Sequence, residues 1–114
     1  MIYKYNLLAF LFLTSVFTYA QSDSEEKLVG EGISLHDKGE FKAAITKYDK
    51  ALSENPESIL ALGEKAYSLM MLNKYEEVIK TCKKCFKIAP NSDELKTIYT
   101  TYANSYDMMG QPGK

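Results

Sequence analysis

The sequence predicts an all-α protein, a solenoid of antiparallel helix pairs with about two and a half repeats. Apolar residues recur at three- and four-residue intervals through most of the chain, which is the spacing of one face of an amphipathic helix. The turns between these segments are only two to four residues long, and short turns make neighbouring helices antiparallel. The segment from Gly39 to Pro56 also returns 34 residues later, from Asn73 to Pro90. A fixed offset of this kind favours stacked repeats over the remaining alternative, an unrelated five-helix bundle.

The first twenty residues differ in kind from the rest of the chain. Lys4 precedes an apolar run over residues 7–17, and small residues lead to a possible cleavage site between Ala20 and Gln21. The run is too short to cross ~30 Å of hydrocarbon as a helix. We therefore predict a cleaved signal peptide over residues 1–20 and an exported protein, periplasmic or extracellular, with no membrane span in the mature chain. A retained membrane anchor or a buried core helix is the alternative.

Composition limits the possible partners and the source of stability. The chain is 46% apolar and 25% charged, which is typical of a globular domain. Its basic residues are all Lys, whereas nucleic-acid readers depend on Arg for bidentate contacts, so we expect no nucleic-acid partner. The chain has two Cys, too few for the disulfide framework of a small secreted domain. Packed apolar surface must therefore supply most of the stability.

Capping and turn residues predict where the helices begin and end. A polar leader over residues 21–24 precedes the first helix, where Asp23 and Glu26 form a capping-box pattern. Gly39 is expected to end this helix in the left-handed conformation that glycine tolerates. Pro56 is expected to stop the second helix and to lie in the first turn of the third.

Five apolar stripes predict five helices, and Asn91 with Glu94 forms a capping-box pattern before the last. The expected stripes are Leu28, Val29, Ile33 and Leu35; Phe41, Ala44, Ile45, Tyr48, Ala51 and Leu52; Leu60, Leu62, Ala66, Tyr67, Leu69, Met70 and Leu72; Tyr75, Val78, Ile79, Cys82, Cys85, Phe86 and Ile88; and Ile98, Tyr99, Tyr102, Ala103, Tyr106 and Met109.

The repeated positions carry a recurring set of residues. The first copy has Leu28, Glu31-Gly32, Leu35, Ala44, Tyr48, Ala51 and Pro56; the second has Leu62, Lys65-Ala66, Leu69, Val78, Cys82, Cys85 and Pro90; the last helix has Tyr99, Tyr102-Ala103, Tyr106 and Gly110, about three residues late. With its 34-residue period, this set resembles the tetratricopeptide repeat family. Its small residues, Gly32, Ala44, Ala51, Ala66 and Ala103, are expected to let helices approach closely, while Tyr48 and Tyr99 fill the gaps between layers.

The resemblance implies repeats over residues 25–58 and 59–92, and a helix over 93–110 before a terminal turn over 111–114. That last helix has no second helix after it in this sequence. Repeat folds bury each apolar face on a neighbouring unit and need about three units. Either the fifth helix caps a two-repeat domain, or the chain is the front of a longer array, and its Tyr-rich face favours the second hypothesis.

The Cys82-Lys83-Lys84-Cys85 segment is the most chemical-looking motif. One hypothesis is a thiol–disulfide oxidoreductase in which Lys83 and Lys84 lower the thiol pKa. Redox motifs of this spacing usually begin a helix after a strand, whereas this one lies inside a helix, at positions that other repeats give to core residues. We therefore interpret both thiols as small apolar core groups.

Other polar residues suggest no chemistry. His36 has no visible nucleophile partner and is expected at an exposed helix end, where its cation would favour the helix dipole. The two sulfurs lack the further ligands of a metal site. Lys80, Lys83, Lys84 and Lys87 form a basic strip, interpreted as a solvated face, with an anionic-partner patch as the alternative. The sequence thus predicts no catalytic residues, no metal and no cofactor.

The resemblance implies a non-catalytic interaction scaffold that holds a protein or peptide in a concave groove lined by the first helix of each pair. The expected lining residues are Val29, Ile33, His36, Glu64, Tyr67, Met70, Met71, Asn104, Asp107 and Met108. Some family members hold a terminal carboxylate with Lys and Asn in this groove, and that Lys-rich set is missing here. Two alternatives stay open: the Tyr67, Met70 and Met71 surface packs on further repeats, or the unit only spaces or caps a larger envelope protein.

Overall fold

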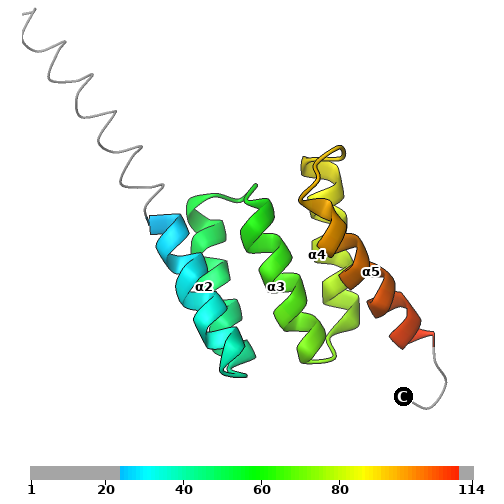
Figure 1. The fold of residues 1–114 in the computed structure, drawn as a ribbon, viewed down its shortest axis with the longest axis horizontal. Helices are drawn as coiled ribbons and strands as arrows, with labels where there is room; N and C mark the ends of the chain where they lie inside the picture. The colour runs from blue at the N-terminus through cyan, green and yellow to red at the C-terminus, as the bar shows by residue number, and fades with distance from the viewer. Residues whose placement is uncertain (1–23, 111–114) are drawn as a thin grey trace, which may run out of the picture.

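The computed structural model describes residues 24–110, which form helices joined by short turns (Figure 1). An N-terminal helix over residues 24–37 is followed by α2 (Phe41–Glu54), α3 (Ile59–Met71), α4 (Tyr75–Ile88) and α5 (Leu95–Met109). The described residues contain no strand, so the predicted all-α class and helix-pair solenoid are confirmed. The predicted signal peptide, the terminal turn and the Asp23 half of the first capping box lie outside the described residues. None of the helices within 24–110 combines the length and apolarity needed to cross a bilayer.

The helices form two layers with different packing. Helix α3 contacts α2, α4 and α5, whereas α2 and α4 do not contact one another. The first helices of successive pairs are therefore closer together than the second helices, and the array bends toward the layer that contains α3 and α5. This bend makes the side of α3 and α5 the concave one.

Two apolar clusters hold the pairs together. One lies between the N-terminal helix, α2 and α3 and contains Val29, Ala44, Tyr48, Ala51 and Ala61. The other lies between α3, α4 and α5 and contains Leu62, Ala66, Leu69, Val78, Cys82, Cys85, Leu95 and Ile98. Burying one large apolar side chain stabilises a domain by about 1.5–3 kcal/mol, so these clusters are the main source of stability.

Helix α5 buries a different face from the predicted one. Tyr99 is 50% exposed and Ala103 is also exposed, whereas Leu95, Ile98, Thr101 and Ser105 are buried. A comparison of equivalent positions in α3 and α5 explains which face of α5 is buried. Ile98 and Ser105 lie 37 residues after Ala61 and Ser68, which are buried in α3.

Tyr99 and Tyr106 lie at the same 37-residue offset from Leu62 and Leu69, which belong to the cluster that contains α4 residues. Within residues 24–110 no helix follows α5 to cover the two Tyr rings in the same way. The Tyr99 ring instead stacks on Phe86, with ring centroids 4.3 Å apart. The prediction that Tyr99 and Ala103 pack between layers is therefore wrong for the described part of the chain.

The turns before α3 and α5 also differ from the predicted caps. Pro56 lies in the turn before α3, and the first residue of the helix is Ile59. Ser58 caps α3 instead, because the Ala61 backbone N–H donates to Ser58 Oγ at 3.2 Å. The Asn91 and Glu94 capping box does not form, since the Glu94 backbone N–H donates to Ser92 Oγ at 3.2 Å and Glu94 makes no side-chain cap.

Candidate binding pocket

A pocket of about 370 Å³ lies between α3 and α5 on the concave side of the array. Its volume falls in the range of about 300–1,000 Å³ that is usual for ligand pockets. The lining residues are Ile59, Leu60, Gly63, Glu64, Tyr67, Glu94, Thr97, Ile98 and Thr101. They come from helices that are consecutive in the concave layer but separated in the sequence by α4.

The local structure of α3 explains why its lining residues point away from the core. Leu62, Ala66 and Leu69 bury one face of the helix. Leu60, Glu64 and Tyr67 are spaced by four and three residues on another face, so they share a side of the helix. Leu60 is 57% exposed and Tyr67 is 43% exposed, which leaves two large apolar surfaces available at the pocket.

Two carboxylates, Glu64 and Glu94, are the charged groups of the lining. Burial raises the pKa of the Glu64 carboxyl, the charge of His36 lowers it, and the negative charge of Asp37 raises it again. Neither pocket carboxylate forms an ion pair with a Lys of the described residues. The pocket is therefore apolar with a net negative charge.

His36 supports the Tyr67 side of the pocket. Its Nδ1 is hydrogen-bonded to Ser68 Oγ at 2.8 Å, and its ring centroid lies 4.6 Å from that of Tyr67 and 5.0 Å from that of Phe41. His36 is half-buried, so the prediction of an exposed helix end is wrong. The N-terminal helix ends next to α3, and this contact places the imidazole against the Tyr67 ring.

The structure brings together two of the residues predicted for the groove, Glu64 and Tyr67. Val29 is only 3% exposed and belongs to the core, so it cannot line a groove. The others do not line this pocket: Ile33 and Met70 are half-buried and pack on the core, Met108 is half-buried, and Met71, Asn104 and Asp107 are exposed.

Sequence reasoning missed the lining residues from the start of both helices. The apolar stripe of the third helix predicts Leu60 in the core, although Leu60 breaks the spacing of Leu62, Ala66 and Leu69. That break in spacing is the signal in the sequence that Leu60 lies on another face of the helix. No pattern in the sequence indicated Glu94 or Thr97, because their place opposite α3 depends on how α5 packs.

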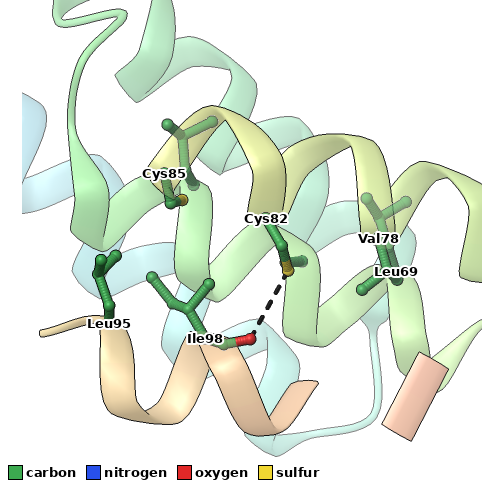
Figure 2. Packing of buried hydrophobic residues seen from close by; sticks show 8 residues of the cluster. Leu69, Val78, Cys82, Cys85, Leu95 and Ile98 are labelled. Carbon is green, nitrogen blue, oxygen red and sulfur yellow. Dashed lines mark hydrogen bonds between the residues drawn. The ribbon is translucent and has the colours of Figure 1, made fainter. Parts of the chain in front are cut away.

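The two thiols lie in the core between α3, α4 and α5. Cys82 and Cys85 are fully buried and not disulfide-bonded, and Cys82 Sγ donates to the Ile98 carbonyl oxygen at 3.8 Å (Figure 2). Burial raises the pKa of Cys82 to about 12 and that of Cys85 to about 11. The hypothesis that Lys83 and Lys84 lower these pKa values is wrong, since both lysines are exposed while the thiols point inward.

Comparison with known proteins identifies the family and similar proteins. A tetratricopeptide repeat family model matches residues 35–111. The chain is 35% identical over 79 residues to the Protein STIP1 homolog of Dictyostelium discoideum, an alignment that covers 69% of this chain and 14% of that protein. The fold is similar to the second TPR of Spaghetti (RPAP3) bound to the HSP90 peptide SRMEEVD, with a TM-score of 0.70 and 18% identity over 81% of this chain and 84% of that one.

Proposed function

Because this chain belongs to the tetratricopeptide repeat family, we propose that it is a non-catalytic interaction scaffold that holds a segment of a protein partner in the α3–α5 pocket. The observation that carries this proposal is the pocket itself. It joins the exposed apolar surfaces of Leu60 and Tyr67 to two carboxylates on the concave side of the array. Single exposed apolar residues are normal, but apolar residues gathered in a concave site are typical of binding sites.

The support given to Tyr67 strengthens this assignment. An exposed aromatic ring would lose conformational freedom when a partner binds, which costs free energy. The His36 ring, itself hydrogen-bonded to Ser68, already restricts Tyr67 in the free chain. Less free energy is then lost on binding, so Tyr67 is suited to act as a fixed contact for a partner side chain.

The comparisons support the class of function and leave the partner open. The similar solved structure is described as holding a peptide, and a peptide-sized partner also suits a 370 Å³ pocket. The chain spans only 14% of the curated relative that it matches, so that protein's partners are not transferred to this chain.

Selection from a phage-displayed library of random peptides tests the proposal. We expect the full chain to enrich peptides that bind at least tenfold more weakly to a Leu60→Ser/Tyr67→Ala variant. Both residues are exposed, so the variant should keep its helix content. Met71→Ala is the matched control, because Met71 lies on the same helix and is 46% exposed but does not line the pocket. Failure to enrich peptides, or equal binding by the double variant, would overturn the proposal.

We also propose that the protein acts outside the cytoplasm, after cleavage near Ala20 and Gln21. The support is the N-terminal pattern of one positive residue, an apolar run and small residues before the cleavage site. Mass spectrometry of protein recovered from outside the cytoplasm of producing cells should show Gln21 as the first residue. A chain of the full 12.9 kDa found only inside the cells would contradict export.

A further inference from the structure

We propose that the α3–α5 pocket accepts a basic side chain, Arg or Lys, from a partner segment in which apolar residues flank that side chain. This inference rests on the proposed function and names the chemistry of the partner. The lining contains Glu64 and Glu94 and no basic residue, so a bound segment meets two negative charges beside apolar surface.

The pocket carboxylates differ from several others in the chain. Glu31, Asp49 and Asp93 are paired with Lys47, Lys65 and Lys96 at 2.7, 2.7 and 3.5 Å. Glu64 is half-buried and has no Lys partner, and the nearby charge of His36 does not fully offset the effect of burial, because the Glu64 pKa stays raised. A partly desolvated carboxylate whose charge is not fully offset is unfavourable, and a cation that arrives with a partner removes part of that cost.

The distribution of charge makes the pocket selective. The exposed basic strip of Lys80, Lys83, Lys84 and Lys87 belongs to α4, which contributes no residue to the pocket lining. Outside the lining, the charge of His36 lowers the Glu64 pKa and the smaller effect of the Asp37 charge raises it, so the two carboxylates of the lining set the sign of the charge in the pocket. An acidic segment would therefore meet repulsion in the pocket, whereas a basic one would be attracted.

The apolar part of the lining fits the rest of such a side chain. Tyr67 is three residues after Glu64 on α3, which places its ring beside the carboxylate on one side of the helix. A cation can then contact the ring face and the carboxylate together. Leu60 offers surface for an apolar neighbour in the partner segment. Arg fits best, since its planar guanidinium pairs with carboxylates and stacks on aromatic rings.

Binding of matched peptides to the full chain tests the inference. The probes are fluorescein-labelled heptapeptides that differ only at the central residue, which is Arg, Gln or Glu between two leucines. We expect the Arg peptide to bind about tenfold or more tightly than the Gln peptide, and the Glu peptide to bind most weakly. The acidic peptide SRMEEVD, held by the similar structure, should also bind weakly here.

Two charge variants make the test specific. Glu64→Gln/Glu94→Gln should weaken binding of the Arg peptide to the level of the Gln peptide while leaving the Gln peptide unaffected. Glu76→Gln/Glu77→Gln is the matched control, because it removes two exposed carboxylates from α4 outside the pocket and should change nothing.

The outcomes separate this inference from the proposed function. Equal binding of the three heptapeptides, or an unchanged Arg peptide on the Glu64→Gln/Glu94→Gln variant, would overturn the basic partner and leave the scaffold proposal standing. The same holds if the Arg peptide does not bind but library peptides do. If neither the heptapeptides nor any library peptide binds, both proposals fail.

Discussion

Gly39 and Asn73 lie 34 residues apart and share the left-handed backbone conformation, with φ of 79° and 60°. Their turns also share hydrogen bonds. The Gly39 N–H donates to the His36 carbonyl at 2.8 Å, and the Asn73 N–H donates to the Met70 carbonyl at 2.9 Å. The sequence repeat is thus also a repeat of the turn that reverses the chain within each pair.

The first prediction concerns the conformation of these two turns. No atom lies within 4 Å of a Cβ added at Gly39, so Gly39→Ala changes only the backbone preference. It should lower the free energy of unfolding by about 1–2 kcal/mol, because the left-handed conformation is unfavourable for a residue with a Cβ. Asn73→Gly should change it by less, because the relief of positive φ is offset by loss of the hydrogen bond that the Tyr75 hydroxyl donates to Asn73 Oδ1 at 2.8 Å. Urea unfolding followed by circular dichroism measures both changes, and an unchanged midpoint for Gly39→Ala would contradict the turn assignment.

The second prediction concerns the contact between Gly32 and Tyr48. A Cβ at Gly32 would overlap the Tyr48 ring, lying 2.8 Å from Cδ1, and Tyr48 is fully buried. Gly32→Ala should therefore destabilise the chain by about 1–3 kcal/mol. Gly30→Ala is the control in the same helix, because its added Cβ meets no atom within 4 Å. That control should gain up to about 1 kcal/mol from helix propensity. Thermal unfolding of both variants checks the pair, and similar shifts would mean that Gly32 does not lie against the ring.

The third prediction concerns the thiols. Burial raises the pKa of Cys82 to about 12 and that of Cys85 to about 11, so little thiolate exists at pH 8. An aromatic disulfide reagent should react slowly with the native chain at this pH and rapidly after unfolding in urea. Because native thiols hold their protons more tightly than unfolded ones, this contribution to stability is complete below about pH 8.5 and falls as pH rises toward 11. Fast labelling of the native chain would revive the redox hypothesis.

The fourth prediction concerns the cost of keeping Glu64 charged. Burial raises its pKa above the ordinary 4.5, so the folded chain binds this proton more tightly than the unfolded chain. The free energy of unfolding therefore decreases as pH rises through the interval above 4.5. Glu64→Gln should raise the urea midpoint at pH 7, and the gain should shrink as pH falls toward 4. The control Glu76→Gln, at an exposed position of α4, should show no such trend. A lower midpoint for Glu64→Gln at pH 7 would contradict this account.

The groove was only partly predictable from the sequence. The repeat pattern indicates some of its residues, whereas the exposure of others depends on how the helices pack. The family resemblance predicts Glu64 and Tyr67 in the groove, and both line the pocket. Leu60 was assigned to the core because apolar residues usually lie there, although its spacing differs from that of the buried stripe. The resemblance also predicts Val29 in the groove, but Val29 lies in the core between helices.

The sequence by itself determined the helices, the turn at Gly39 and the 34-residue repeat. These features depend on local spacing, on a turn residue that tolerates positive φ and on the recurrence of α2 as α4. Only the tertiary structure decided which face of α5 is buried and that Glu64 and Glu94 line one pocket. The physical reason is the packing of α5 on α3 and α4, which places Ile98 against the core and leaves Tyr99 exposed. Glu64 and Glu94 are about thirty residues apart and line one pocket only because of that packing, which no local sequence pattern encodes.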